Sequence, residues 1–410
     1  MKSVHVVGAG LAGLSAAVAL TEAGAHVTLH DSNPAAGGRC RSYYDKELGC
    51  RLDNGNHLVL SGNRDTFAYL ATIGATDTMV GPDEPEFPFM DLATGERWTV
   101  RPNRGRIPWW VLAPSRAVPG ARLRDFVAAA LLSRAGPDTT VQQALPPGEL
   151  YRRLLEPLAI AALNTPPATA SARLMGAVMD ESLSRGGAAC RPMVPRDGLS
   201  ESFVDPALAY LTARGATIRL GHRVGSVTVA EDRVVALDGE PVDSVVIATP
   251  APVSSALLPG LIVPDAFESI LNVHFRIDIP DAPVSFIGLL GGVAEWIFVK
   301  PGVVSITVSA GNDRAGLTSD ALAQQVWSDV HTALAGSLDG AGPIPPYRVV
   351  REKRATFAAT PAQDRRRPAA RTAYHNLVLA GDWTATGLPA TIEGAIRSGR
   401  IAASVLCHPP

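Results

Sequence analysis

A glycine-rich turn between an apolar strand and an alanine-rich helix constrains this chain more than any other feature. The residues "VHVVGAGLAGLSAAVALTEAG" run from Val4 to Gly24. Their β-branched start predicts a strand, and the Ala- and Leu-rich stretch that ends at Gly24 predicts a helix. A second predicted strand, "AHVTLHD", ends at Asp31, 18 residues after Gly13. This order of strand, turn, helix, strand and acid is typical of a dinucleotide-binding unit.

Each glycine of the turn has its own physical task. Gly8 allows the turn, Gly10 lets the backbone approach a pyrophosphate, and Gly13 lets the helix pack closely on the strand. The helix N-terminus directs amides and positive dipole toward the phosphates. The expected dinucleotide contacts are therefore Gly8, Ala9, Gly10, Leu11, Ala12, Gly13, Asp31 (to a ribose) and Ser32. The alternative is a glycine-rich turn in a βα unit that binds no ligand.

Composition excludes several function classes. A chain of 410 residues, 46% of them hydrophobic, can form two interleaved domains with large cores. The net charge of -2 shows no basic excess, so no nucleic-acid partner is expected. The four cysteines lack CxxC spacing, which predicts reduced thiols, no metal site and a cytoplasmic setting. No run reaches about 18 apolar residues, so we expect a soluble protein or one on a membrane surface.

A second glycine-rich turn, "AAGGRC", indicates which dinucleotide is bound. Gly37, Gly38 and Arg39 follow the predicted second strand. The segment resembles the GG motif of FAD-binding amine oxidases and carotenoid desaturases. The resemblance implies FAD as the cofactor, with Arg39 supplying positive charge on the phosphate side. The alternative is a solvated turn with a surface arginine.

Two later stretches resemble further parts of the same FAD-binding domain. The stretch from Gly215 to Pro250 shows β-type runs, and "NLVLAGDWTATGLPATIEGAIRSGRIAASVL" from Asn376 predicts strand, turn and helix. The resemblance implies that Val224 contacts the adenine and Asp382 the ribityl chain. It also implies that the helix from near Thr391 directs its amides at the flavin. These implied contacts are Val224, Gly381, Asp382, Pro389, Ala390, Thr391 and Ile392. The alternatives are a β-meander without ligand and a helix whose Glu393 only complements its dipole.

These stretches predict an α/β fold with a Rossmann-like FAD-binding domain of the GR2 (amine oxidase) type and a discontinuous α+β substrate domain. The FAD-binding domain is expected to comprise residues 1–76, 196–256 and 372–410, and the substrate domain residues 77–195 and 257–371. The runs "ILNVHFRIDIP", "VSFIGLL", "EWIFVKPG" and "VVSITVSAG" predict a sheet in the substrate domain. "TSDALAQQVWSDVHTALAG" predicts a helix capped by Thr318 or Ser319.

Nearly the whole chain resembles one branch of the superfamily, the hydroxysqualene dehydroxylases of bacterial squalene and hopanoid biosynthesis. The motifs that carry this are "DNGNHLVLSG", "EPLAIAALNTPPATASARLM", "PRDGLSESFVDPALAYL" and "AGDWTATGLPATIEGAIRSG". Asn56 is a departure, because a glutamine is expected there. The resemblance implies a reductive reaction in which hydroxysqualene loses its hydroxyl, gains hydride from reduced FAD and gives squalene and water. An apolar pocket would shield the cation from water.

The proton donor for the leaving oxygen stays open at this point. The resemblance places Gly55, Asn56 and His57 beside the flavin ring, so His57 could protonate the oxygen, hydrogen-bond the flavin or simply be packed. Asp53 and Glu393 are weaker candidates for the acid. Asn164 could orient substrate or could only end a helix before Pro166. Trp383 is the remaining candidate substrate contact.

A basic, tryptophan-containing segment suggests contact with a membrane. Residues 97–124 hold seven arginines and three tryptophans. The helical pattern that follows spaces its apolar side chains as one stripe, formed by Leu123, Phe126, Val127, Ala130 and Leu131. An interfacial helix of this kind would give a C30 substrate an entrance from the inner face of the membrane. The alternative is a helix that faces the protein core.

The sequence also permits other interpretations of the function and implies partners. The chain carries one dinucleotide fingerprint, so an external electron donor is expected, and the resemblance suggests neighbouring squalene-pathway enzymes as partners. A carotenoid or phytoene desaturase or a flavin amine oxidase would run the redox chemistry in the opposite direction. A prenyl-binding escort protein would share the architecture without catalysis, although the Gly381–Asp382 motif argues against it.

Overall fold

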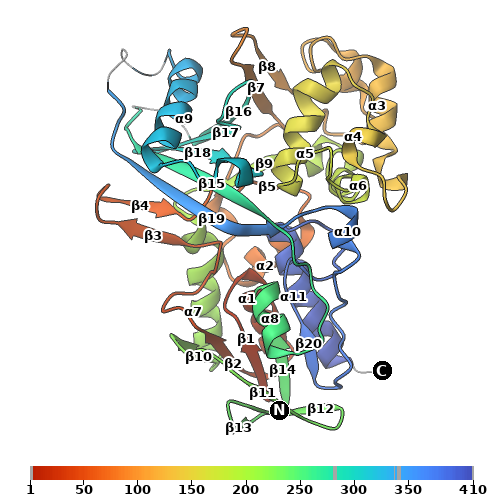
Figure 1. Cartoon of the computed structure of the whole chain (residues 1–410), viewed down its shortest axis with the longest axis vertical. Helices are drawn as coiled ribbons and strands as arrows, with labels where there is room; N and C mark the ends of the chain where they lie inside the picture. Colours follow the sequence, from red (N-terminus) through yellow and green to blue (C-terminus); the bar gives the residue numbers. More distant parts are fainter. Residues whose placement is uncertain (1–2, 280–283, 337, 339–342, 409–410) are drawn as a thin grey trace.

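The computed structural model describes residues 3–279, 284–336, 338 and 343–408. The lower part of Figure 1 is a five-stranded sheet in the order β10-β2-β1-β14-β20, with all neighbours parallel. Its strands are β1 (Ser3–Val7), β2 (His26–Asp31), β10 (Thr217–Leu220), β14 (Ser244–Ile247) and β20 (Leu377–Leu379). The sheet therefore unites the three stretches in which the sequence predicted parts of one cofactor domain.

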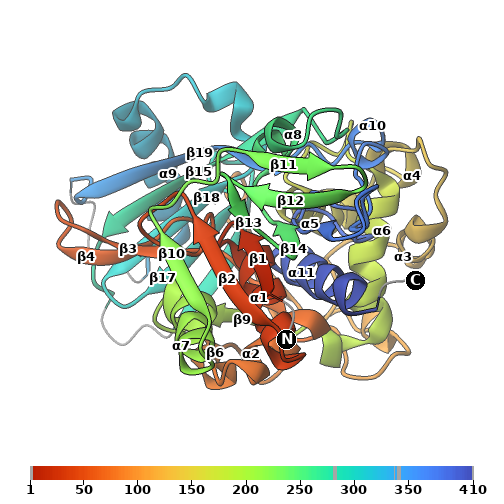
Figure 2. The ribbon, with the colours of Figure 1, turned by 90° about the horizontal axis from the view of Figure 1, so that it is seen from below.

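Both faces of this sheet are buried, as continuous apolar strands require. Val6 and Val246 pack against α1 (Leu11–Glu22), α7 (Asp205–Ala213) and α11 (Ile392–Cys407). On the opposite face, Val245 and Ile247 belong to a core shared with α8 (Ala251–Leu257) and β12. Figure 2 shows the small sheet β11 (Val227–Ala230), β12 (Arg233–Leu237) and β13 (Glu240–Pro241) over the parallel strands.

Glycine permits backbone-to-backbone packing at the centre of this layer. A Cβ atom on Gly13 would lie 1.8 Å from the carbonyl oxygen of Gly8, and one on Gly399 would lie 2.3 Å from that of Ala12. Gly8 itself has a φ of +111°, which side chains rarely tolerate. Helix α1 can therefore lie directly against β1 and α11.

The upper part of the molecule is built on a seven-stranded sheet in the order β19-β15-β18-β17-β16-β7-β8. The strands are β7 (Phe87–Asp91), β8 (Arg97–Val100), β15 (Phe267–Arg276), β16 (Ser285–Leu290), β17 (Trp296–Lys300), β18 (Val303–Val308) and β19 (Tyr347–Phe357). The four predicted runs form β15 to β18, and Pro280 of the first run lies outside the described residues. The predicted helix is α9 (Ser319–Ala333), and its cap is Thr318, which accepts the amide of Ala321.

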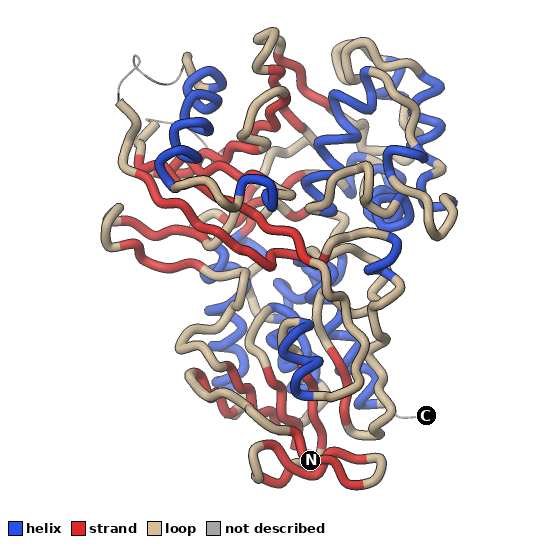
Figure 3. Tube along the Cα trace, viewed as in Figure 1, coloured by secondary structure: helices blue, strands red, loops and turns tan. Residues whose placement is uncertain are grey.

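The two faces of the seven-stranded sheet differ. Val273 and Ile306 pack against α9, whereas Phe89, Trp98 and Trp296 face the opposite way. Figure 1 shows α9 on one side and a helical lobe on the other, and Figure 3 shows how helix gathers in that lobe. The lobe contains α3 (Leu123–Ala130), α4 (Val141–Ala144), α5 (Glu156–Leu163) and α6 (Ala172–Glu181).

Short elements connect the two parts of the molecule. They are β3 (Ser42–Asp45), β4 (Cys50–Asp53), β5 (Val59–Leu60), β6 (Met79–Val80), β9 (Pro192–Pro195), α2 (Arg64–Thr72) and α10 (Pro361–Asp364). Among the described residues, no helix combines the length and the apolar character that crossing a bilayer requires.

Three histidines form a row that begins on β1 and β2 of the cofactor sheet. His5 Nδ1 lies 3.0 Å from His30 Nε2, and His30 Nδ1 lies 3.2 Å from His222 Nδ1. Burial, together with the neighbouring histidines and Arg219, lowers the pKa of His30 to about 4. The folded state therefore holds a neutral imidazole where the unfolded chain would bind a proton.

We expect His30 to make stability depend on pH. Because its folded pKa is lowered from 6.5 to about 4, its contribution is complete above pH 6.5 and is lost as the pH falls toward 4. The variant His30→Gln should lower the slope of unfolding free energy against pH in this window by up to about 1.4 kcal/mol per pH unit. Urea unfolding across this window measures the slope. An unchanged slope in the variant would contradict the prediction.

Candidate functional site

The carboxyl ends of the parallel strands bring the predicted cofactor residues to one edge. Gly8 follows β1, Asp31 ends β2, and Gly381 follows β20. The amide of Gly37 donates to the carbonyl of Ala9 at 2.8 Å, so the second glycine turn lies directly on the first. The edge therefore carries two adjacent glycine turns and an acidic residue.

An ion pair joins the second turn to the C-terminal stretch. Arg39 Nη2 lies 2.7 Å from Asp382 Oδ2, although 343 residues separate the two in sequence. The carboxylate is 10% exposed, and it raises the pKa of Arg39 further. A second nitrogen of Arg39 donates to the carbonyl of Ala355 at the end of β19. Arg39 thus connects the cofactor edge with the upper sheet.

The edge fits a dinucleotide. A Cβ on Gly10 would meet nothing within 4 Å, so the space above this backbone is kept free, in contrast to Gly13. Gly10 is the N-cap of α1 and has no side chain to satisfy the first amides, which suits an anionic phosphate. Asp31 accepts the amides of Ala9 at 2.7 Å and Asn33 at 2.8 Å, which orders the turn around it. Leu11 and Ala12 are buried in the first turn of α1, and Ser32 is exposed.

The loop containing Val224 lies beside the same edge. The amide of His222 donates to the carbonyl of Asp31 at 2.8 Å, and Asp238 accepts the amides of Gly225 and Ser226. Val224 lies between these two anchors and is 7% exposed. Its position permits the adenine contact that the sequence predicts, and that contact stays a prediction.

Helix α11 begins at the site with a threonine cap. Thr391 Oγ1 accepts the amide of Gly394 at 3.0 Å. Pro389 and Ala390 precede this cap, and Ile392 is buried behind it. The contact of this helix N-terminus with the flavin, which the resemblance implies, stays a prediction.

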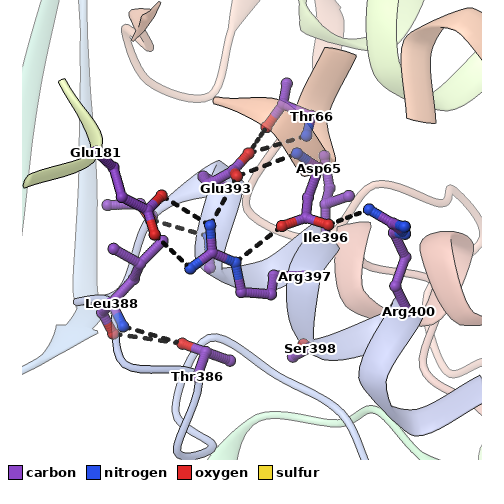
Figure 4. A network of polar contacts seen from close by, with 12 residues as sticks. Asp65, Thr66, Glu181, Thr386, Leu388, Glu393, Ile396, Arg397, Ser398 and Arg400 are labelled. Atoms are coloured by element: carbon purple, nitrogen blue, oxygen red, sulfur yellow. Dashed lines mark hydrogen bonds and ion pairs between the residues drawn. The ribbon is translucent and has the colours of Figure 1, made fainter. Parts of the chain in front are cut away.

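The carboxylate of Glu393 binds other parts of the protein. Figure 4 shows its carboxylate at the start of α2, where it accepts the amide of Thr66 at 2.8 Å and that of Asp65 at 3.1 Å. It also pairs with Arg397 at 3.0 Å, and Arg397 binds Glu181 at 2.7 Å. Glu393 thus caps a helix far away in sequence, and none of these contacts supports its candidacy as the proton donor.

Asp53 is held as an anion. Its Oδ2 lies 2.7 Å from Lys300 Nζ, and its Oδ1 accepts the amide of Leu199 at 2.9 Å and the hydroxyl of Ser42 at 2.7 Å. Burial acts to raise the pKa of Asp53, but Lys300 and these hydrogen bonds outweigh it and keep the pKa below its ordinary value. An ionised Asp53 ties the loop to its neighbours and cannot donate a proton at neutral pH.

His57 lies close to a polar row on the upper sheet. A Cβ on Gly55 would lie 3.3 Å from Asn272 Nδ2 and 3.8 Å from His57 Nε2. Asn56 donates to Thr307 Oγ1 at 3.0 Å, which donates to Asn272 Oδ1 at 3.1 Å. Burial lowers the pKa of His57 to about 4; Asp53 opposes this shift, and Arg39 and Lys300 add to it. The imidazole is therefore neutral at pH 7.

The two predicted substrate residues have other partners. Asn164 ends α5 in the left-handed conformation, donates to Thr356 Oγ1 at 3.0 Å and accepts the amide of Ala310 at 2.7 Å. The indole of Trp383 is 3% exposed and donates to the carbonyl of Thr249 at 3.0 Å. These contacts give Asn164 its helix-ending role, and a substrate contact at either residue stays a prediction.

Sequence reasoning missed a buried arginine that shapes the C-terminal turn. The side chain of Arg367 is 1% exposed, lies on the ring of Phe357 and donates to the carbonyls of Asp382 and Thr384. Its neighbours Arg365 and Arg366 are 58% and 40% exposed. The run "RRRP" gives no local signal for which arginine is buried. Lys300 and Asn272 were also missed, because their partners lie far away in sequence.

Comparison with known proteins agrees with this geometry. Residues 11–407 match the family described as flavin containing amine oxidoreductase. The chain is 45% identical to a hydroxysqualene dehydroxylase of Sinorhizobium fredii over 98% of both chains. It is 44% identical to one of Rhodopseudomonas palustris over 99% of this chain and 98% of that one.

A solved structure shows the same fold. An oxidoreductase from Methanosarcina mazei superposes with a TM-score of 0.71 over 97% of this chain and 99% of its own. The sequences are 13% identical, so this likeness concerns the fold alone.

Two glycine variants should separate folding from cofactor binding. Gly13→Ala places a methyl group 1.8 Å from a backbone oxygen, so we expect a loss of at least about 3 kcal/mol of unfolding free energy. Gly10→Ala meets no protein atom within 4 Å, so stability without cofactor should change by less than about 1 kcal/mol. FAD affinity should nevertheless fall about tenfold or more, because the methyl group enters the space for the pyrophosphate. Denaturant unfolding and FAD titration measure both effects, and tight FAD binding by Gly10→Ala would contradict the assignment.

Proposed function

Because the chain belongs to the hydroxysqualene dehydroxylases, within the flavin containing amine oxidoreductases, we propose that it reductively removes the hydroxyl group of hydroxysqualene. It is an FAD-dependent oxidoreductase. In the proposed reaction the carbon–oxygen bond breaks, hydride and a proton are consumed, and squalene and water form. Bound, reduced FAD supplies the hydride. The convergence of Gly10, Arg39 and Asp382 at one edge supports this proposal, because residues from both ends of the chain could hold one FAD there.

A group of aromatic side chains on the upper sheet suits the ionisation of an allylic alcohol. Phe89, Phe298 and Trp296 form a continuous aromatic face on the upper sheet, with Phe286 between the last two. Such a face excludes water, which would otherwise capture a cation before it is reduced. It also accepts the hydrocarbon chain of an isoprenoid without unpaired polar groups. We propose that the substrate chain lies along this face.

The neutral imidazole of His57 is the group we assign to the leaving oxygen. Asp53 is ionised and bound by Lys300, and Glu393 is enclosed by α2 and Arg397. Among the described residues His57 forms no ion pair, and its pKa of about 4 leaves an uncharged ring at neutral pH. Its uncharged N–H can hydrogen-bond the leaving oxygen and stabilise the negative charge that develops there, while the proton that completes water must come from a second donor.

The partners follow from this chemistry. An external electron donor must reduce the cofactor, and enzymes that make hydroxysqualene are the expected neighbours in the pathway. We also propose a peripheral location on the inner face of a membrane, because a C30 substrate partitions into lipid.

Product analysis tests the direction of the reaction. Anaerobic protein with chemically reduced FAD should convert hydroxysqualene to squalene, which mass spectrometry detects. Oxidised protein given a polyene precursor should form no additional double bonds, whereas a desaturase would form them. A purified protein that is colourless and stays so after FAD is added would indicate a prenyl-binding escort protein and contradict the proposal.

Substitution of His57 tests its assignment. His57→Phe removes the N–H and should lower kcat by about 10²- to 10⁴-fold with little change in KM. His57→Gln keeps an N–H donor and should retain more activity. Because the ring is neutral from about pH 6 to about pH 8, the ratio of wild type to His57→Gln should stay constant there. Equal activity of His57→Phe and wild type would remove His57 from the mechanism.

A further inference from the structure

The helical lobe carries a concentrated apolar surface. Of the twelve exposed large apolar side chains among the described residues, six lie within residues 107–131. We call these six the apolar patch: Ile107, Trp109, Leu112, Leu123, Val127 and Leu131. Their exposed fractions range from 46% for Leu131 to 80% for Ile107, so they do not contribute to the core of the lobe. A clustered apolar surface of this kind marks an interaction site more often than scattered residues do.

The patch arises because the stripe predicted for α3 is divided between the interior and the surface. Phe126 turns inward and meets Trp110 edge to face at 5.5 Å, and Ala129 is buried. Leu123, Val127 and Leu131, spaced four residues apart, lie on the outer side of the same helix. Figure 1 shows α3 at the outer margin of the lobe, far from the cofactor sheet.

The segment that carries the patch has an excess of positive charge. Residues 101–135 contain seven arginines and one acidic residue, Asp125, in a chain whose net charge is -2. Arg101 and Arg104 pair with Glu86 and Glu84, which leaves Arg106, Arg116, Arg122, Arg124 and Arg134 as the excess. Asp125 is 8% exposed and accepts the amide of Arg122, so it offers little negative charge at the surface. Arg116 lies over the exposed ring of Trp109 at 5.1 Å. Arginine beside an exposed tryptophan is typical of residues that anchor at a lipid headgroup region.

We infer that the apolar patch is a docking surface for an anionic phospholipid bilayer. The inference rests on the proposed function, since the proposed substrate is dissolved in lipid. Apolar side chains would enter the acyl boundary while the surrounding arginines contact lipid phosphates. A second copy of the chain fits less well, because a two-fold contact would bring the same arginines against one another.

The interior of the lobe supports this orientation. One hydrophobic cluster includes Trp110 and Leu132 of the lobe, Leu154 and Met175 in its interior, and Trp296 on the upper sheet. Because Phe126 of α3 meets Trp110 edge to face, the helix that carries the patch packs on the same apolar interior as the aromatic face.

Vesicle sedimentation of the FAD-loaded protein tests the inference. Wild type should bind vesicles of phosphatidylcholine with phosphatidylglycerol more tightly than phosphatidylcholine alone. The triple variant L123S/V127S/L131S should bind at least about tenfold more weakly. The matched control V235S/V253S/I262S removes apolar side chains that are exposed elsewhere, and it should bind within about twofold of wild type. The variant R106Q/R122Q/R124Q should lose about fivefold per arginine on the anionic vesicles only, with a weaker salt dependence.

One further measurement distinguishes the failure of the docking surface from the failure of the proposed function. Squalene formation in detergent micelles reports the proposed reaction without a bilayer, and L123S/V127S/L131S should retain it. Loss of vesicle binding by the patch variant with retained activity supports the docking surface. If the wild type lacks the proposed activity, loss of vesicle binding by the patch variant still supports the docking surface. The inference would be overturned if wild type did not bind anionic vesicles, or if the control variant lost binding as much as the patch variant. It would also be overturned if wild type formed a dimer that the substitutions in the patch dissociate.

Discussion

The parallel pairing of five short strands is the constraint on which the site depends. Parallel strands end at one edge, so residues near positions 8, 31 and 381 meet there although the chain separates them. The pairing in turn needs α1 to lie against β1 and α11 at backbone distance, which only glycine at positions 13 and 399 allows. A change at either glycine therefore alters the sheet, the turn and the cofactor edge together.

Paired charges fix the remaining parts around this edge. Arg39 links the edge to Asp382 and the upper sheet, Arg367 holds the turn that follows Asp382, and Glu393 caps α2. Each charge is satisfied by a carboxylate, a carbonyl or a helix amide, because an unpaired charge would be costly to bury. These contacts join segments that share no local pattern, and they set where α11 begins relative to the cofactor edge.

The distribution of polarity matches a reaction on a hydrocarbon. The upper sheet has an aromatic side that shares one hydrophobic cluster with the helical lobe, and Asn56 joins a hydrogen-bonded row with Thr307 and Asn272 of this sheet. The same apolar continuity reaches the outer surface at α3, where it meets a cluster of arginines. In the proposed function, the apolar surface at α3 serves the uptake of substrate, and the aromatic side of the upper sheet shields the reaction from water.

The sequence by itself determined the βαβ unit, strands β15 to β18 of the upper sheet, the helix starts near Thr391 and Thr318, and the family, because these depend on spacing, periodicity and short motifs that act over a few residues. Only the tertiary structure decided that Glu393 caps α2, that Asp53 is bound by Lys300 and that Arg367 is the buried one of three arginines. It also decided that four of the five side chains of the α3 stripe are exposed. Each of these depends on a partner far along the chain or on which side of a helix finds a neighbour. Local patterns do not encode such partners, since burial and pairing are set when the sheets and the lobe pack together.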